Sequence, residues 1–156
     1  MIKLLFVCHG NICRSPMAEF VMKDLVARAG RAAEFTIASA ATSAEEIGNP
    51  VYPPARQMLA QHGIRCAGKT ARQLRQGDYD QWDLFLGMDR ANLRNMRALF
   101  GGDGGHKIYS LLSFAASDRD IADPWYTGNF QATWEDVNAG CAALLQALDS
   151  GFLKRK

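Results

Sequence analysis

The sequence predicts a single α/β domain in which four parallel strands are covered by helices on both faces. Short apolar runs alternate with amphipathic helical patterns along the chain, an order typical of a parallel sheet. The length of 156 residues is usual for one domain, and a hydrophobic content of 48% excludes a disordered chain. Because neither a repeat nor a low-complexity tract divides the sequence, we expect one domain over residues 1–156.

The first half of the chain predicts two strands and two helices. The apolar run 3–7 indicates the first strand, and the helix after it begins at Pro16 and ends at Gly30, since proline starts helices well and glycine ends them. Residues 35–38 indicate the second strand. A loop rich in proline then leads into a helix over residues 56–61.

The second half repeats this alternation. Residues 83–88 predict the third strand, after which Asp89 caps a helix that carries Leu93, Met96 and Leu99. A glycine-rich turn precedes the fourth strand at 107–109. Apolar residues of the final helix recur at three- and four-residue steps: Phe130, Trp134, Val137, Cys141, Leu144, Leu145 and Leu148. Together these elements predict a three-layer fold of the flavodoxin-like or Rossmann-like kind.

Composition and charge exclude several classes of protein. A net charge of +2 without a markedly basic face predicts neither a nucleic-acid partner nor a membrane partner. No stretch approaches the roughly 18 apolar residues of a membrane span. Four cysteines are too few for a disulfide framework, and the apolar N-terminal run is too short for a signal peptide, so we expect a cytoplasmic protein.

The loop between the first strand and the first helix has the pattern of an oxyanion site. Cys8 and Arg14 are separated by five residues, and a helix begins directly after them. We expect the loop backbone to surround a phosphate, with the arginine closing the ring and the helix N-terminus adding positive potential. The same field favours a thiolate at Cys8, so phosphate binder and nucleophile coincide. The expected phosphate-binding residues are His9, Gly10, Asn11, Ile12, Cys13 and Arg14.

A carboxylic acid is the second group that this chemistry requires. A leaving alkoxide or phenoxide needs a proton, and the ligand of an open parallel sheet lies beyond the carboxyl ends of its strands. Asp118, Asp120 and Asp123 follow the fourth strand, and Asp123 is the strongest candidate because a proline and two aromatic residues come next. Trp125 and Tyr126 predict the walls of a cleft for a phenyl group.

These motifs resemble the low-molecular-weight protein tyrosine phosphatases over nearly the whole chain. The resemblance includes the opening strand and loop 8–16, Ser39-Ala40-Ala41-Thr42, His62-Gly63-Ile64, Ala71-Arg72-Gln73-Leu74, Met88-Asp89 with Asn92-Leu93, and Asp123-Pro124-Trp125-Tyr126. It implies a cysteine-dependent hydrolase that needs no cofactor or metal. The implied substrates are phosphotyrosine proteins or small aryl phosphates, and inorganic phosphate is the implied product.

The resemblance also implies individual roles. Cys8 would form a phosphocysteine, Arg14 would bind two phosphate oxygens, and Asp123 would act as general acid and then as base. Ser15 would donate a hydrogen bond to the Cys8 sulfur. Asn11 and Ser39 would support the loop in one network, and Ile12, Trp125 and Tyr126 would line the substrate cleft.

Three positions depart from the family pattern. Ala41 stands where the family usually has glycine, and Glu45 occupies a cleft position that is often aromatic in relatives. The histidine that supports the asparagine network in some relatives has no clear match near Gly68 and Lys69.

Other activities on this scaffold remain alternatives. Protein-arginine phosphatases tend to have threonine where this chain has Ile12. The apolar isoleucine favours a phenyl ring over a guanidinium group. An arsenate reductase needs further cysteines after the third strand, and residues 67–140 contain none. A phosphate-binding module without activity is disfavoured because nucleophile, arginine, serine and acid are all present.

Cys13 is expected to serve as a redox partner that traps oxidised Cys8 as a disulfide.

Overall fold

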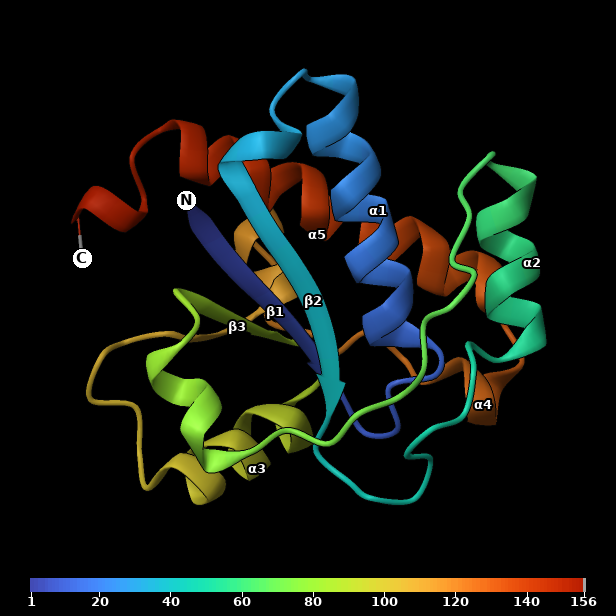
Figure 1. Cartoon of the computed structure of the whole chain (residues 1–156), viewed down its shortest axis with the longest axis horizontal. Coiled ribbons are helices and arrows are strands. Elements are labelled where there is room, and N and C mark those ends of the chain that lie inside the picture. Colours follow the sequence, from blue (N-terminus) through green and yellow to red (C-terminus); the bar gives the residue numbers. More distant parts are fainter. Residues whose placement is uncertain (156) are drawn as a thin grey trace.

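The computed structural model of the protein describes residues 1–155 and contains a four-stranded, fully parallel sheet (Figure 1). The strand order is β2-β1-β3-β4, so β1 lies inside the sheet although it comes first in the chain. This confirms the predicted fold class. The strands and α-helices are β1 (Ile2–Cys8), α1 (Arg14–Arg28), β2 (Phe35–Ala41), α2 (Pro53–Gln61), β3 (Leu84–Gly87), α3 (Arg90–Phe100), β4 (Ile108–Ser110), α4 (Pro124–Thr127) and α5 (Phe130–Asp149). Short 3-10 helices lie at Ala32–Glu34, Gln76–Asp80, Leu111–Ala115 and Leu153–Arg155.

Pairing with β1 determines where the neighbouring strand β2 ends. Leu4 lies opposite Ile37 of β2 and Leu84 of β3, and the pairing with β2 continues as far as Cys8 and Ala41. For this reason β2 ends at Ala41, further along the chain than predicted. Cys8 and Ala41 are therefore neighbours at the carboxyl edge of the sheet.

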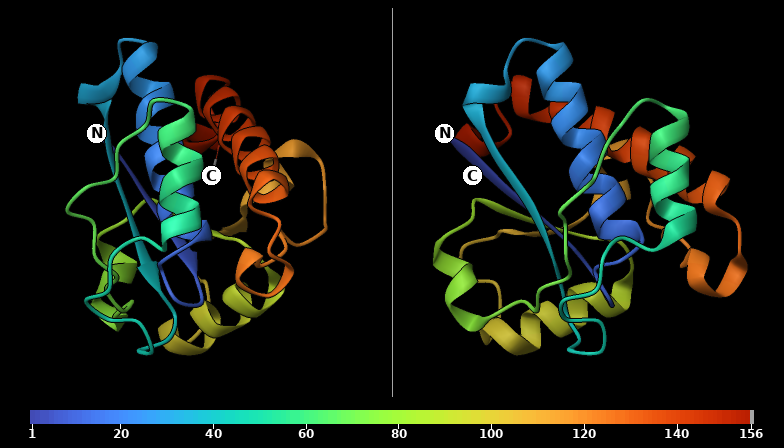
Figure 2. Two further views of the ribbon diagram at one scale, coloured as in Figure 1. Left: turned by 90° about the vertical axis from the view of Figure 1, so that its right-hand side faces the viewer. Right: turned by 45° about the vertical axis from the view of Figure 1, so that its right-hand side comes forward.

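Successive side chains of β1 point to opposite faces of the sheet and are buried in two separate hydrophobic cores. Leu4 and Phe6 are fully buried in the larger core, beneath α1, α2 and α5. Leu5 and Val7 point to the opposite face, where they pack in a smaller core that includes Met96 of α3. Figure 2 shows α1, α2 and α5 on the same side of the sheet. Helices cover both faces, as the sequence predicts.

Two helices begin earlier than predicted. α1 begins at Arg14, two residues before Pro16, so the last part of the predicted loop is already helical. α2 begins at Pro53 instead of residue 56. Proline is well accommodated in the first turn of a helix because the N–H that it lacks has no partner inside the helix.

The later helices follow the predicted pattern with one exception. Asp89 caps α3 and accepts a hydrogen bond from the backbone N–H of Asn92 at 2.8 Å. Met96 is buried, whereas Leu99 is 38% exposed near the end of the helix. The apolar stripe of α5 packs against the larger core. Among the described residues, no helix combines the length and apolar character that crossing a bilayer requires.

Candidate active site

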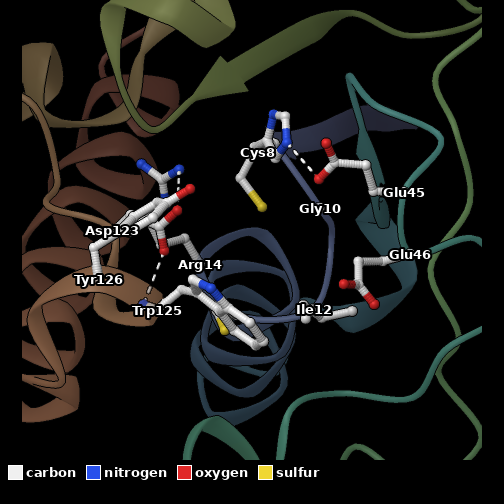
Figure 3. Close-up of a pocket in the computed structure, with 11 residues that line it drawn as sticks. Cys8, Gly10, Ile12, Arg14, Glu45, Glu46, Asp123, Trp125 and Tyr126 are labelled. Carbon is white, nitrogen blue, oxygen red and sulfur yellow. Dashed lines mark hydrogen bonds and ion pairs between the residues drawn. The ribbon is translucent and has the colours of Figure 1, made fainter.

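The loop between β1 and α1 curls around the sulfur of Cys8, which points into a pocket (Figure 3). The backbone N–H of Asn11 donates to Cys8 Sγ at 3.3 Å, and Ser15 Oγ lies 3.0 Å from the same sulfur. Asn11 has a φ of 60°, a left-handed conformation that asparagine adopts more readily than most residues. Since α1 begins at Arg14, its positive N-terminus lies next to the loop.

The side chain of Asn11 holds this turn from within. Its Nδ2 donates to Ser15 Oγ at 2.8 Å and to Ser39 Oγ at 2.9 Å. Its Oδ1 accepts a hydrogen bond from the backbone N–H of Arg72 at 3.2 Å. Asn11, Ser15 and Ser39 are all buried, so these bonds do not compete with bulk water. The network joins the loop to α1, β2 and the segment before the second 3-10 helix.

Arg14 is almost fully buried, and its guanidinium is fixed from several sides. Nη1 donates to Asp89 Oδ2 at 2.7 Å and to the backbone carbonyl of Ile121 at 2.9 Å, while Nη2 is 3.4 Å from Asp123 Oδ2. Burial opposes the charged form of Arg14, but the negative groups around it, Cys8 and Asp89 first, outweigh burial and raise its pKa. The guanidinium is therefore a permanent cation at the base of the pocket.

Of the aspartates that follow β4, Asp123 lies in this pocket. It caps the short helix α4, accepting from the N–H of Trp125 at 3.0 Å, and its side chain remains 25% exposed. Asp120 lies elsewhere, since it accepts from the backbone N–H of Arg90 at 3.1 Å. Asp118 and Asp120 line a different cavity next to α3. Of the three acids that the sequence offers, only Asp123 lines the pocket of Cys8.

The pocket is a cavity of about 120 Å³ with two chemically different walls. Trp125 and Tyr126 lie on one side, and the carboxylates of Glu45 and Glu46 lie on the other (Figure 3). The side chain of His9 contacts Glu45 Oε2 at 2.9 Å at the mouth. The lining residues are Cys8, His9, Gly10, Ile12, Cys13, Arg14, Glu45, Glu46, Asp123, Trp125 and Tyr126.

The two aromatic residues differ in how firmly they are held. Trp125 is 52% exposed, and its ring packs against that of Tyr52 with the centroids 4.8 Å apart. Tyr126 is 83% exposed and forms the outer rim. Tyr52 is not predictable from the sequence, because it lies in an irregular segment far from the motif that it supports. Glu46 was also missed; its side chain packs against Gly10, where an added Cβ would lie 3.4 Å from its Cγ.

Two charged residues behind the loop were missed as well. Glu19, on α1, is only 4% exposed and accepts from Ser39 Oγ at 2.6 Å. Lys69 donates to the backbone carbonyl of Ser39 at 3.0 Å, at the place where no histidine could be matched. Glu19 follows Ser15 by four residues, so the helical repeat was the one signal that could have placed it on the face of Ser15.

The three cysteines other than Cys8 are buried, free thiols, and Ala41 is part of a regular strand. Cys66 and Cys141 are buried and free, and burial raises the pKa of both thiols. Cys13 lines the pocket, and its pKa is raised to about 12 by burial and by the neighbouring charge of Cys8. Ala41 lies in a regular strand, where its N–H donates to Arg72 at 2.8 Å. The described residues contain no group of three or more potential metal ligands.

Comparisons with known proteins agree with this geometry. Residues 3–153 match the model of the family described as low molecular weight phosphotyrosine protein phosphatase. The chain is 37% identical over 150 residues to the low molecular weight protein-tyrosine-phosphatase YfkJ of Bacillus subtilis, covering 95% of this chain and 96% of that protein. The crystal structure of YfkJ superposes with a TM-score of 0.93, 38% identity and 96% coverage of each chain. A Drosophila arginine phosphatase superposes with a TM-score of 0.87 and 30% identity, covering 96% of this chain and 99% of that one.

Proposed function

The chain belongs to the low molecular weight phosphotyrosine protein phosphatase family, and we propose that it hydrolyses phosphotyrosine and small aryl phosphates through a phosphocysteine at Cys8. It is a cysteine-dependent phosphomonoester hydrolase. The observation that carries the assignment of residues is the meeting of Cys8, Arg14 and Asp123 in one pocket. Thiol, cation and acid come from three distant parts of the sequence, and this chemistry needs all three.

In the first step, the Cys8 thiolate attacks phosphorus while the bond to the phenolic oxygen breaks. Arg14 binds two phosphoryl oxygens through the edge of its guanidinium that faces the pocket, since Nη1 is engaged by Asp89 and Ile121. Backbone N–H groups of residues 9–13 bind the phosphoryl oxygens. Asp123 gives its proton to the departing phenoxide.

In the second step, water attacks the phosphocysteine and releases inorganic phosphate. The Asp123 carboxylate now accepts a proton from the water, which restores its acid form. The sulfur leaves as a thiolate, and Ser15, whose Oγ is 3.0 Å from Cys8 Sγ, donates a hydrogen bond that stabilises it. Ser15 thus favours the step in which Cys8 must leave.

The cleft favours a flat substrate. Ile12 adds an apolar side chain to the lining between Trp125 and Glu46, and Trp125 with Tyr126 forms an aromatic side against which a phenyl ring can pack. A phosphotyrosine protein is the proposed partner, with no role for nucleic acid or membrane. The free state of all four cysteines supports a reducing compartment, and we propose the cytoplasm.

A matched set of peptides tests the proposed substrate class. One sequence is prepared with phosphotyrosine, phosphoserine or phosphoarginine at the same position, and the rate of phosphate release is measured. We expect the phosphotyrosine peptide to have the highest kcat/KM. A higher kcat/KM for phosphoarginine would replace this proposal with protein-arginine phosphatase activity, for which the acidic wall of Glu45 and Glu46 could accept a guanidinium group.

A further inference from the structure

A stripe of polar residues on α1 leads away from Cys8 along one face of the helix. Ser15, Glu19 and Lys23 follow one another at four-residue steps and therefore share one helix face. Glu19 is 4% exposed, an unusual position for a carboxylate. Its Oε1 accepts from Ser39 Oγ at 2.6 Å, and its Oε2 accepts from Lys23 Nζ at 2.6 Å.

Lys69 reaches the same carboxylate from another part of the chain. Its side chain is 13% exposed, and its Nζ lies 3.5 Å from Glu19 Oε1 and 3.0 Å from the carbonyl of Ser39. Burial lowers the pKa of Lys69, Glu19 opposes this effect, and Arg72 and Lys23 are the other charges that act on it. Lys23 is 42% exposed, so Lys69 is the more deeply buried of the two cations next to Glu19.

The charge of Glu19 fixes the direction of every hydrogen bond between it and the nucleophile. A carboxylate only accepts, so the proton of Ser39 must point at Glu19 and the lone pairs of Ser39 must face Asn11. Asn11 then donates its two Nδ2 protons to Ser39 and Ser15. Because Ser15 accepts from Asn11, its own proton is available to the sulfur of Cys8, 3.0 Å away.

We propose that Lys69 is a positioning residue: it supplies the counter-charge that keeps Glu19 an acceptor and so orients the hydrogen bonds Glu19–Ser39–Asn11–Ser15 toward Cys8. Neither Lys69 nor Glu19 lines the pocket, so both act through the residues between. A buried carboxylate is costly, and without Lys69 only the more exposed Lys23 would balance its charge, so the hydrogen bonds around Glu19 would rearrange. This inference rests on the proposed function of Cys8 and Ser15.

Three variants and a control test the inference. Lys69→Met removes the counter-charge, Lys69→Arg keeps it, and Glu19→Gln/Lys69→Met removes both charges while the amide oxygen of glutamine can still accept from Ser39. Lys23→Met is the matched control, since it removes the more exposed cation from the same carboxylate. For each protein, kcat for an aryl phosphate and inhibition by inorganic phosphate are measured well below the unfolding temperature and normalised to the folded fraction.

We expect kcat to fall about tenfold in Lys69→Met and to return to within about threefold of wild type in Lys69→Arg and in the double variant. Phosphate inhibition should change less than about threefold, because Arg14 and the loop are intact. The Lys23→Met control should lose less than about twofold. If Lys69→Met does not fold, Lys69→Gln takes its place, with the same expected loss.

Other outcomes would overturn the inference. A double variant as slow as Lys69→Met, or slower, would mean that Lys69 only fills space. Equal losses in Lys23→Met and Lys69→Met would remove the special role of the buried lysine. Normal kcat in Lys69→Met would refute the inference and leave the proposed function intact, whereas a wild-type protein that does not cleave aryl phosphates would contradict the proposed function itself.

Discussion

Nη1 of Arg14 lies 2.7 Å from Oδ2 of Asp89, so the first residue of α1 is joined to the residue that caps α3. The two helices cover opposite faces of the sheet, and this ion pair connects them across its carboxyl edge. Both side chains are held by other bonds as well, Arg14 by a backbone carbonyl and Asp89 by the N–H of Asn92. The guanidinium is thus oriented by the fold itself, as preorganised electrostatic catalysis requires.

Replacing Cys8, the proposed nucleophile, should separate phosphate binding from turnover. In Cys8→Ser we expect kcat for an aryl phosphate to fall more than about 1,000-fold, because a serine hydroxyl is not ionised in the same loop. Phosphate binding should remain largely intact, since Arg14 and the loop backbone are unchanged. Steady-state kinetics and calorimetric titration with phosphate measure the two properties. Turnover near the wild-type rate would exclude Cys8 as the nucleophile.

Replacing Asp123, the proposed general acid, should make the rate depend more strongly on the leaving group than it does in wild type. In Asp123→Asn we expect phosphorylation by a phenyl phosphate to slow about 100-fold, and by an activated nitrophenyl phosphate to slow much less, because a better leaving group needs less protonation. Single-turnover rates across leaving groups of different basicity measure this. Asp120→Asn is the matched control and should resemble wild type, since Asp120 lies outside the pocket. An unchanged dependence in Asp123→Asn would give the acid role to another residue.

Oxidation tests the role of Cys13. Peroxide converts the Cys8 thiolate to a sulfenic acid, and the Cys13 thiol can attack that sulfur, releasing water and forming a disulfide. Burial, followed by the charge of Cys8, raises the pKa of Cys13 to about 12, so Cys13 is a thiol at neutral pH. Wild type should regain activity with dithiothreitol after peroxide treatment, whereas Cys13→Ser should recover less than about half as much. Equal recovery would show that Cys13 gives no protection.

Asp78 should make stability depend on acid pH. Its carboxylate is 3% exposed and pairs with both Nη atoms of Arg72 at 3.1 and 3.2 Å. Burial alone would raise the pKa of Asp78, but Arg72 and the N–H of Arg75 lower it below the ordinary 3.8. The charged form therefore stabilises the fold above pH 3.8, and this contribution is lost as pH falls through the lowered pKa.

In Asp78→Asn, the free energy of unfolding at pH 7 should fall by about 1–2 kcal/mol. The difference from wild type should stay constant down to about pH 4 and shrink below it, because wild type then loses the same interaction. Urea unfolding of both proteins at several pH values measures this. A difference that grows on acidification would contradict the expected sign.

Gly140 should resist replacement although it lies within a helix. A Cβ on Gly140 would lie 2.6 Å from Cγ of the fully buried Leu111, so α5 would have to move away from the segment after β4. The overlap should cost about 1–3 kcal/mol, and alanine recovers roughly 1 kcal/mol through its helix propensity, so we expect Gly140→Ala to lower the free energy of unfolding by up to about 2 kcal/mol. Gly104→Ala, where a Cβ meets open space, is the control and should change stability little. Thermal or urea unfolding of wild type and both variants measures these changes in stability, and a Gly140→Ala protein as stable as wild type would contradict the prediction.

The sequence was most informative where local patterns carry the structure. The strand–loop–helix order around Cys8, the cap at Asp89 and the long stripe of α5 are each encoded within a few residues, and the structure contains all three. The end of β2 was not predictable in the same way, because it depends on pairing with Cys8 in another strand. The start of α2 lies before the predicted one because its two leading prolines, which also favour loops, form the first turn of the helix.

The support of the site was harder to predict than its reacting groups. Glu19 and Lys69 are single charges in unremarkable segments, and only the folded chain shows that they meet at Ser39. Tyr52 behind Trp125 is a similar case. Each of these contacts joins segments far apart in sequence, so neither periodicity nor a motif could reveal it.

The interior place of β1 has a consequence for how the protein is made. Cys8 is synthesised before β2 and β3, which its strand needs as neighbours, and Asp123 and α5 follow later still. A partly synthesised chain therefore holds Cys8 with neither Asp123 nor the helix that closes the larger core. Most of these contacts are non-local, which slows folding relative to helical bundles. Phosphatase activity should thus arise only once α5 has left the ribosome, because the larger core is incomplete before then.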